Sequence, residues 1–274
     1  MLTKGGRSQT NLLTVHYSGT KQRRQDVVVG EEPLEIRLDF GGDAVPFTVT
    51  MRTPGNDFDL VAGLLFSEGI VADRYDIADI RYCNGTVEEQ NYNVVVVKLR
   101  NAKRSILPNE RSLVSTSACG VCGKATIDDL HQAADSVPDT LTISPEGLIS
   151  LVDVMRAKQF QFDRTGGIHG AAIFRGDLTL SCLREDVGRH NAVDKAIGSL
   201  FLDQTLARGK VMLVSGRAGY EIIQKAIVAK LELVASVSAP SSLAVDLAKD
   251  FGMTLVGFLR DSSFNIYTHE HRIT

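Results

Sequence analysis

Residues 211–260 set the fold class, and they read VMLVSGRAGYEIIQKAIVAKLELVASVSAPSSLAVDLAKDFGMTLVGFLR. Three apolar runs alternate here with two amphipathic segments, a pattern that predicts three strands joined by two helices. In chain order, these segments cover residues 211–217, 218–231, 233–240, 241–252 and 253–260. Strands that alternate with helices favour a mostly parallel sheet covered on both faces, so we predict a layered α/β domain.

The residues upstream of this stretch predict a different order of strands and helices. In chain order, they predict strands at 31–40 and 41–53, a helix at 57–70, and strands at 77–85 and 92–100. The turn Gly41-Gly42-Asp43 would join the first two strands as a hairpin. Asp57 or Asp59 would cap the helix, and Gly69 would end it. These elements predict a small α+β unit.

A polar connector with a proline, residues 101–112, marks the predicted domain boundary. The charged run KQRRQ at 21–25 is typical of a solvated tail. We therefore predict a flexible N-terminal tail at 1–28, a small α+β domain at 29–110, and a larger α/β domain at 111–274. The overall class is α/β, or α+β when both domains are counted.

Composition excludes several classes of protein. Hydrophobic content of 43% and charged content of 23% over 274 residues are ordinary for a globular chain. A net charge of −3 gives no reason to expect nucleic acid or an anionic membrane as a partner. The first residues lack the apolar core of a signal peptide, and no apolar run is long enough to span a bilayer, so we expect a cytoplasmic protein.

The sequence Cys119-Gly120-Val121-Cys122 is the strongest candidate for reactive chemistry. Four cysteines are too few for a disulfide framework, and in a reducing compartment paired cysteines indicate metal ligands or reactive thiols. A helix is predicted to begin near Lys124. Its macrodipole and the Lys124 ammonium would both favour thiolate, the reactive form.

Three uses of this cysteine pair remain open from the residues alone. A structural zinc site needs two further ligands. Cys83 and Cys182 are the remaining cysteines, but each lies in an apolar strand context typical of a buried small hydrophobe. A sulfur carrier needs one exposed nucleophilic cysteine, and a dithiol redox centre needs both. Spacing alone favours zinc over sulfur carriage and redox chemistry.

Two loops of the C-terminal domain are suited to anions. Ser215-Gly216-Arg217 and Pro240-Ser241-Ser242 each follow a predicted strand and precede a predicted helix, where backbone N–H groups are free to bind phosphate. The alternative is that Ser241 and Ser242 only cap the helix. Together with Arg217 and Arg260, the loops favour a phosphorylated or nucleotide-like ligand.

Residues 184–195 form a dense charged cluster directly after an apolar strand. Its members able to take part in chemistry are Arg184, Glu185, Asp186, Arg189, His190, Asn191, Asp194 and Lys195. Helix capping or a solvated face would explain several of them. We select Arg189 and His190 as the site candidates, and note His169 on a glycine-rich turn nearby.

Several long motifs, in this order, resemble the FdhD/NarQ family of formate dehydrogenase accessory sulfurtransferases. They are MRTPGNDFDLVAGLLFSEGI at 51–70, STSACGVCGKA at 115–125, TGGIHGAA at 165–172, REDVGRHNAVDKAIG at 184–198, SGRAGYEIIQKA at 215–226, VSAPSSLAVDLA at 237–248 and GFLRDSSFNIYT at 257–268. The resemblance covers the chain from about residue 31 to its end.

The resemblance implies a specific activity. It implies that sulfur arrives from a cysteine desulfurase as a persulfide and is passed to the molybdenum (or tungsten) bis-guanylyl pyranopterin cofactor before insertion into formate dehydrogenase. Cys119 matches the persulfide-bearing position and Cys122 its partner. The cofactor-binding segment matches Phe258, Leu259, Arg260, Asp261, Ser262 and Ser263.

The resemblance also implies an assembly and a fold. The larger domain would be a three-layer α/β/α sandwich similar to the cytidine deaminase fold, and the chain would form a homodimer. The cofactor would be a bound substrate, and no permanently held metal is expected.

Two other functions are alternatives to sulfur transfer. Zinc-dependent deamination needs a Glu close after the His or Cys ligand and a Pro-Cys-x-x-Cys pair, and His169 has no such Glu after it. A zinc-stabilised, non-catalytic chaperone for the cofactor would keep the nucleotide site and make the cysteines structural. It requires about one tightly held zinc per chain, which the sulfur carrier does not.

Overall fold

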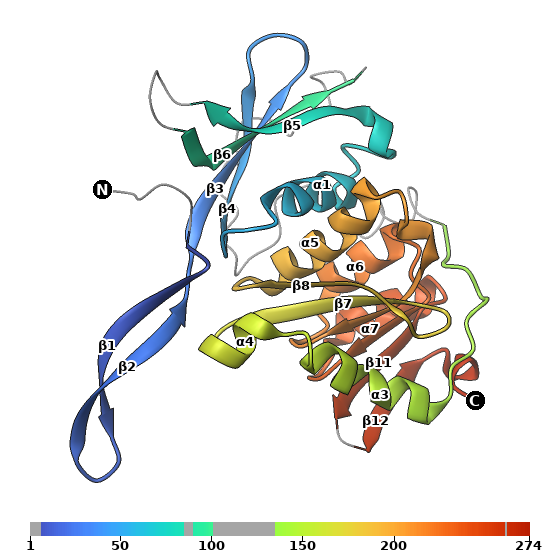
Figure 1. The fold of residues 1–274 in the computed structure, drawn as a ribbon. Coiled ribbons are helices and arrows are strands. Elements are labelled where there is room, and N and C mark those ends of the chain that lie inside the picture. Colours follow the sequence, from blue (N-terminus) through green and yellow to red (C-terminus); the bar gives the residue numbers. More distant parts are fainter. Residues whose placement is uncertain (1–6, 85–89, 101–134, 261) are drawn as a thin grey trace.

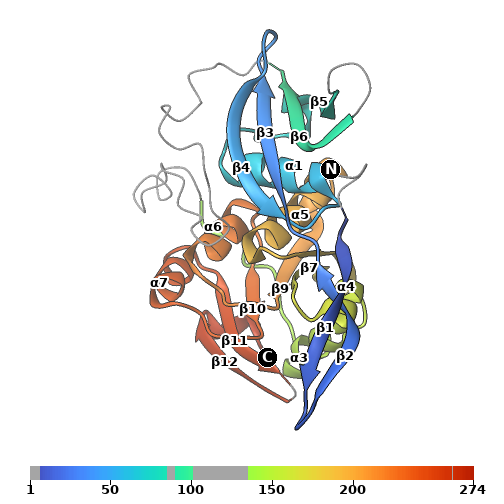
Figure 2. The ribbon, with the colours of Figure 1, turned by 90° about the vertical axis from the view of Figure 1, so that its left-hand side faces the viewer.

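A computed structural model describes residues 7–84, 90–100, 135–260 and 262–274. The described chain holds a six-stranded sheet, a four-stranded sheet and a two-stranded hairpin (Figures 1 and 2). The class is mixed α/β, as the sequence predicts. The predicted boundary between residues 110 and 111 lies outside the described residues.

The six-stranded sheet has the order β12-β11-β10-β9-β7-β8. Its strands are β7 (His169–Arg175), β8 (Leu180–Asp186), β9 (Gly209–Val214), β10 (Leu233–Ser236), β11 (Thr254–Arg260) and β12 (Ser263–Thr268). The three strands predicted within 211–260 are confirmed as β9, β10 and β11, which run parallel to one another. The pairs β7–β9, β7–β8 and β11–β12 are antiparallel, so the sheet is mixed.

Helices cover both faces of this sheet. On one face lie α5 (Arg189–Leu202), α6 (Tyr220–Val228) and α7 (Ser242–Asp250), whose apolar side chains share a core with alternate residues of β7, β9 and β10. On the other face lies α3 (Pro145–Arg156), followed by the short α4 (Phe160–Thr165). The predicted three layers are therefore present (Figure 1). The likeness to cytidine deaminases remains a prediction.

The small domain pairs a four-stranded sheet with one helix. The sheet has the order β4-β3-β6-β5, and its elements are β3 (Glu32–Asp39), β4 (Val45–Arg52), α1 (Asp57–Ser67), β5 (Ile77–Asn84) and β6 (Gln90–Leu99). Every predicted element of this unit is present. Short 3₁₀ helices cover Arg74–Asp76 near this sheet, and Leu206–Arg208 and Glu270–Arg272 in the larger domain.

The predicted cap of α1 is wrong. The N-cap residue is Asn56, in left-handed conformation at φ 54°, and its side chain makes no capping hydrogen bond. The Asp57 carboxylate instead accepts from the Arg52 guanidinium, at 3.1 Å from Nε and 3.0 Å from Nη2. Gly69 follows the helix at φ 70°, as predicted for its end.

The prediction of a flexible tail at residues 1–28 is wrong for residues 9–28, and residues 1–6 lie outside the described residues. Residues 9–29 form an antiparallel hairpin, β1 (Gln9–Tyr17) and β2 (Lys21–Val29), closed at Gly19 with φ 83°. The KQRRQ run lies on β2, where its charges are exposed on a paired strand. We call this hairpin the arm, because it projects away from the two sheets (Figure 1).

The two domains pack through α1 and α5. A Cβ added at Gly63 would lie 1.9 Å from the Asp194 carbonyl oxygen, and one added at Gly198 would lie 1.9 Å from the Asp59 carbonyl oxygen. Only glycine therefore permits this crossing. Phe201 of α5 also belongs to the core of the small domain. The two units are thus bound by a shared apolar core.

Candidate functional site

One edge of the six-stranded sheet gathers the predicted anion-binding loops. The isolated bridge between Ala218 and Pro240 joins the loop after β9 to the loop after β10, with Ser241 N donating to the Ala218 carbonyl at 3.1 Å. Phe258 N donates to the Ser238 carbonyl at 3.0 Å, so the end of β11 lies beside the loop after β10. Segments separated in sequence therefore meet at the carboxyl ends of parallel strands, the usual position of ligand sites in such sheets.

The loop after β9 is built around Gly216. A Cβ at this position would lie 3.2 Å from His169 Nδ1 and 3.7 Å from Arg189 Cβ, so a larger residue would crowd both. Ser215 Oγ accepts from Gly170 N at 2.9 Å. Arg217 is exposed. The loop thus brings His169, Ser215 and Arg189 into one neighbourhood.

The loop after β10 supports the capping interpretation for one of its serines. Ser241 Oγ accepts from Ala244 N at 3.3 Å and caps α7. Ser242 is exposed at the first turn of the helix. Of the two hydroxyls, Ser242 is the freer to contact a ligand.

The segment predicted to bind the cofactor is only partly accessible. Leu259 is fully buried in the core beneath α3, so only its backbone is left for the predicted contact with a ligand. Phe258 adopts φ 55°, and the guanidinium of the exposed Arg260 lies 5.7 Å from its ring centroid. Ser262 and Ser263 are exposed, and Asp261 lies outside the described residues.

Arg189 and His190 begin α5 and face the loop after β9. His190 Nε2 lies 2.8 Å from Glu221 Oε2 at the start of α6, and this contact lowers the pKa of the Glu221 carboxyl. Arg189 Nε and Tyr220 Oη are buried without a hydrogen-bond partner among the described residues. Buried donors are costly to leave unpaired, so these two are suited to an acceptor from a ligand or from outside the described residues.

Burial and the nearby Arg189 charge lower the pKa of His169. A neutral imidazole is therefore favoured at this position near pH 7. It offers one hydrogen-bond donor and one acceptor to the neighbouring loop.

The rest of the 184–195 cluster holds the two domains and α4 in place. Its contacts are Arg184 with Asp59, Glu185 with the amides of Gln161 and Phe162, Asp186 with Lys195 and the Thr53 amide, Asn191 with the Met51 carbonyl, and Asp194 with Lys225. Arg189 and His190, the two selected from sequence, are the members left facing the sheet edge.

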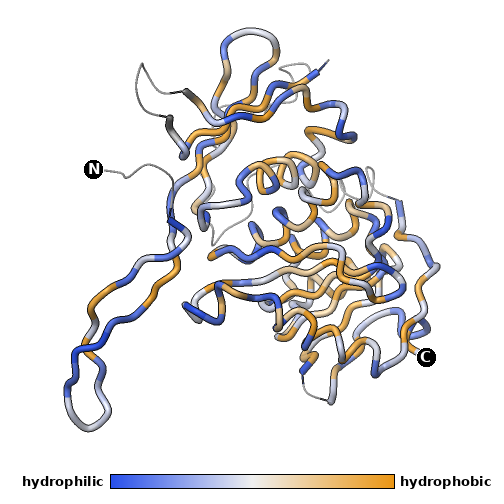
Figure 3. Tube along the Cα trace, viewed as in Figure 1, coloured by the Kyte–Doolittle hydropathy of each residue, from blue (hydrophilic) through white to orange (hydrophobic). Residues whose placement is uncertain are grey.

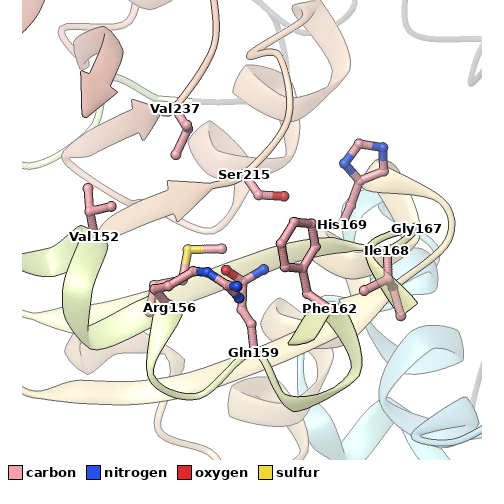
Figure 4. A pocket seen from close by; sticks show the side chains of 11 residues that line it. Val152, Arg156, Gln159, Phe162, Gly167, Ile168, His169, Ser215 and Val237 are labelled. Carbon is pink, nitrogen blue, oxygen red and sulfur yellow. The ribbon is translucent and has the colours of Figure 1, made fainter. Parts of the chain in front are cut away.

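A pocket of about 560 Å³ lies on the α3 and α4 side of the same edge (Figure 4). Its lining includes Val152, Met155, Arg156, Gln159, Phe162, Ile168, His169, Ser215 and Val237. Gln159 is 5% exposed, and its Nε2 has no hydrogen-bond partner in the described part of the chain. Sequence reasoning missed the α3 and α4 residues, because no local motif marks a six-residue helix.

The cysteines divide into two groups. Cys119 and Cys122 lie outside the described residues. Cys182 is buried, which raises the pKa of its thiol, and this confirms its prediction as a core residue. Cys83 is half-buried on β5. In the described ranges, no three His, Cys, Asp or Glu side chains are grouped to hold a metal, and no helix is long and apolar enough to cross a membrane.

Comparisons with known proteins agree with the resemblance. Residues 29–274 match the FdhD/NarQ family. The sulfur carrier protein FdhD of Streptomyces coelicolor is 50% identical over 264 residues, covering 93% of this chain and 92% of the relative. That of Sulfurisphaera tokodaii is 42% identical over 255 residues, covering 93% and 94%.

A solved structure supports the fold. It is described as a candidate formate dehydrogenase accessory protein from Desulfotalea psychrophila, with a TM-score of 0.75, 22% identity, and coverage of 97% of this chain and 99% of that chain. The fold, the extent of the family match and the identity to these relatives lead to one conclusion: the chain belongs to the FdhD/NarQ family.

Proposed function

We propose that this protein is a cytoplasmic sulfur carrier that serves formate dehydrogenase. It accepts sulfane sulfur from a cysteine desulfurase on Cys119 and passes it to the molybdenum bis-guanylyl pyranopterin cofactor. The observation that carries the proposal is the 50% identity to a curated sulfur carrier over nearly the whole of both chains. The cofactor is a substrate here, bound before it is inserted into formate dehydrogenase.

Loading is a thiol exchange without net oxidation. The Cys119 thiolate attacks the outer sulfur of the desulfurase persulfide, and the S–S bond of the donor breaks. The donor cysteine leaves as a thiolate, and Cys119 becomes a persulfide. A thiolate is the required nucleophile, which agrees with the helix and Lys124 predicted after the cysteine pair.

Release uses the second cysteine. The Cys122 thiolate attacks Sγ of Cys119, the persulfide bond breaks, and the outer sulfur leaves as hydrosulfide for the molybdenum centre. The two thiols supply the two electrons and become a disulfide, so a dithiol reductant of the thioredoxin class must restore them.

The sheet edge would hold the nucleotide parts of the acceptor. Phosphates carry negative charge and accept hydrogen bonds, and the exposed Arg217 and Arg260 are suitable cations. Arg189 Nε and Tyr220 Oη are buried donors that lack an acceptor among the described residues. The donor set therefore fits a pyrophosphate-bearing ligand.

Intact mass spectrometry tests the carrier step. The full chain is incubated with a cysteine desulfurase and cysteine, and we expect a gain of about 32 Da that dithiothreitol removes. The gain should be absent in Cys119→Ala. No gain in the wild type, together with one tightly held zinc per chain, would overturn the carrier and favour a zinc-stabilised chaperone.

The release step has its own test. Cys122→Ser should still load sulfur, because Cys119 is intact, but should transfer it poorly to the cofactor. Full transfer by Cys122→Ser would contradict the disulfide-forming step while leaving the loading step intact.

A further inference from the structure

The pocket on the α3 and α4 side of the sheet edge has walls suited to a flat ring. Its volume of about 560 Å³ is within the range of small-ligand sites, roughly 300–1,000 Å³. The strands of the large sheet beside it are mostly hydrophobic along the chain trace (Figure 3). Met155 and Phe162 line the pocket, and the Arg156 guanidinium lies 4.5 Å from the centroid of the Phe162 ring. A thioether, a phenyl ring and a guanidinium all pack well against aromatic ligands.

One polar group of this pocket has no structural use among the described residues. Gln159 is 5% exposed and is the N-cap residue of α4, but its side chain makes no capping hydrogen bond. Its Nε2 is buried without a hydrogen-bond partner in the described part of the chain. Figure 4 shows this amide pointing into the pocket between the side chains of Arg156 and Phe162. A buried donor is costly to leave unpaired, so an acceptor on a ligand would stabilise it.

Gly170 keeps the space beside this amide open. A Cβ at that position would lie 2.6 Å from Gln159 Nε2 and 2.7 Å from Met155 Cε, so a larger residue would displace both groups. Ser215 Oγ accepts from Gly170 N, and its hydroxyl hydrogen can still donate. His169 also lines the pocket. The pocket therefore presents an amide, a hydroxyl and an imidazole to a ligand that is otherwise held by apolar contacts.

An amide side chain is matched by a lactam edge, a ring carbonyl beside an N–H, because each presents one donor and one acceptor. The cofactor of the proposed function carries two such rings, guanine and pterin. The position of the pocket decides between them. Segment 258–263, which matches the cofactor-binding segment of the family, lies at the end of β11. In the sheet, β11 is two strands from β9, roughly 10 Å at about 4.8 Å per strand.

The loops suited to phosphate connect these two places. The loop after β9 begins at the pocket with Ser215, and the loop after β10 meets β11 at Phe258. This arrangement suits a ligand whose two ring systems are joined by a pyrophosphate. With the guanine nucleotide at segment 258–263, the pterin lies at the pocket.

We propose that this pocket binds the pterin ring of the cofactor, with the Gln159 amide hydrogen-bonded to the lactam edge of the ring. The inference rests on the proposed function, because that function supplies the cofactor. Phe162 and Met155 contact the ring, and Ser215 bonds to its polar rim. Molybdenum is bonded to the pterin end of the cofactor, so the pocket positions the sulfur acceptor and not only its nucleotide tail.

Nuclear magnetic resonance of the full chain with isotope-labelled methionine methyl groups tests this assignment, because Met155 lines the pocket. The chain has five methionines, so Met155→Leu identifies the signal. We expect 6-hydroxymethylpterin to shift the Met155 methyl signal until it saturates, and GDP to leave that signal in place. Gln159→Leu should raise the dissociation constant of the pterin about tenfold, because a buried hydrogen bond is lost.

Two further variants complete the test. Gln161→Leu is the matched control, because Gln161 lies on α4 outside the pocket, and it should bind the pterin like wild type. Gly170→Ala should abolish binding, because its Cβ displaces Gln159 and Met155 without removing a polar group. Circular dichroism and thermal unfolding establish that each variant is folded.

Three results would overturn the proposal. The first is a Met155 signal that does not move up to the solubility limit of the pterin. The second is equal pterin affinity in wild type and Gln159→Leu. The third is a Met155 shift caused by GDP and lost in Gln159→Leu, since that would assign the pocket to guanine. Cys119→Ala should bind the pterin like wild type, and sulfur loading is measured separately by mass, so this proposal and the carrier step fail independently.

Discussion

Lys195 and Asp186 form an ion pair that is almost completely enclosed. Their N–O distance is 2.6 Å, and the side chains are 1% and 0% exposed. Lys195 Nζ also donates to the Thr53 carbonyl at 2.8 Å, and Asp186 accepts from Thr53 N at 3.1 Å. The pair therefore joins the large domain to the segment that links β4 and α1.

Removing one partner of this pair should be strongly destabilising. Lys195→Met leaves the Asp186 charge buried without its cation, and we expect a loss of about 3–5 kcal/mol in the free energy of unfolding, measured in urea. Lys230→Met is the matched control, because the Lys230–Asp135 pair is exposed and should contribute about 0–1 kcal/mol. A loss below about 1 kcal/mol in Lys195→Met would contradict the structural role.

His169 should make stability depend on pH. Burial and Arg189 lower its pKa in the folded state, whereas the unfolded value is about 6.5. The unfolded state therefore binds the proton more readily, and stability is lost as pH falls from about 6.5 towards the folded pKa. We expect His169→Gln to flatten this part of the stability–pH curve.

Nuclear magnetic resonance gives a direct check on the same group. The His169 imidazole should titrate below about 6.5, and Arg189→Gln should raise its pKa, because one cause of the shift is removed. An unchanged His169 pKa in Arg189→Gln would show that the Arg189 charge does not affect the protonation of the imidazole.

The sequence shows which residues of the 184–195 cluster are charged, but not which of them hold the fold together. Arg189 and His190 do face the sheet edge, but Asp186, Asp194 and Lys195 are structural. The sequence shows that Asp186 and Asp194 are charged, but it does not show what they bind. Their partners Thr53 and Lys225 lie far away in the chain and come close only in the folded protein. The motif that contains Leu259 likewise does not indicate that the side chain of this residue lies in the core.

At the scale of elements, the crossing of α1 and α5 should tolerate no side chain at its glycines. Gly63→Ala and Gly198→Ala each place a Cβ 1.9 Å from a backbone oxygen, so the helices must separate. We expect a loss of about 1–3 kcal/mol or more for each, measured by chemical unfolding. Gly42→Ala is the control, because nothing lies within 4 Å of its added Cβ. Equal stabilities would contradict the tight crossing.

Elements with strong periodicity were predictable, and the arm was not. The strands and helices of 211–260 differ in the spacing of their apolar residues, so the local sequence was sufficient to predict them. In the arm, both faces are largely exposed, so the apolar alternation of Leu13, Val15 and Tyr17 is offset by the charges of KQRRQ. A strand without a buried face has a weak signature in the sequence, because burial is what imposes the pattern.

At the scale of the whole molecule, the two domains should unfold together. Phe201 of α5 packs in the core of the small domain with Leu60 and Leu65, so neither core is complete alone. We expect one calorimetric transition, with calorimetric and van't Hoff enthalpies in a ratio near one. Phe201→Ala should lower the temperature of that transition without splitting it. Two resolved transitions in the wild type would contradict a shared core.

The glycine crossing also sets the order of events while the chain is being synthesised. Gly63 leaves the ribosome about 135 residues before Gly198, and translation at about 5–20 residues per second makes that interval on the order of ten seconds. Throughout it, α1 can pack on the small sheet but has no helix on its other side, so the face that α5 later covers is available to chaperones. The nascent chain is therefore most exposed to misassembly before residue 202 has been made. At that stage the N-terminal third is complete, but α5, which covers one side of α1, has not yet been synthesised.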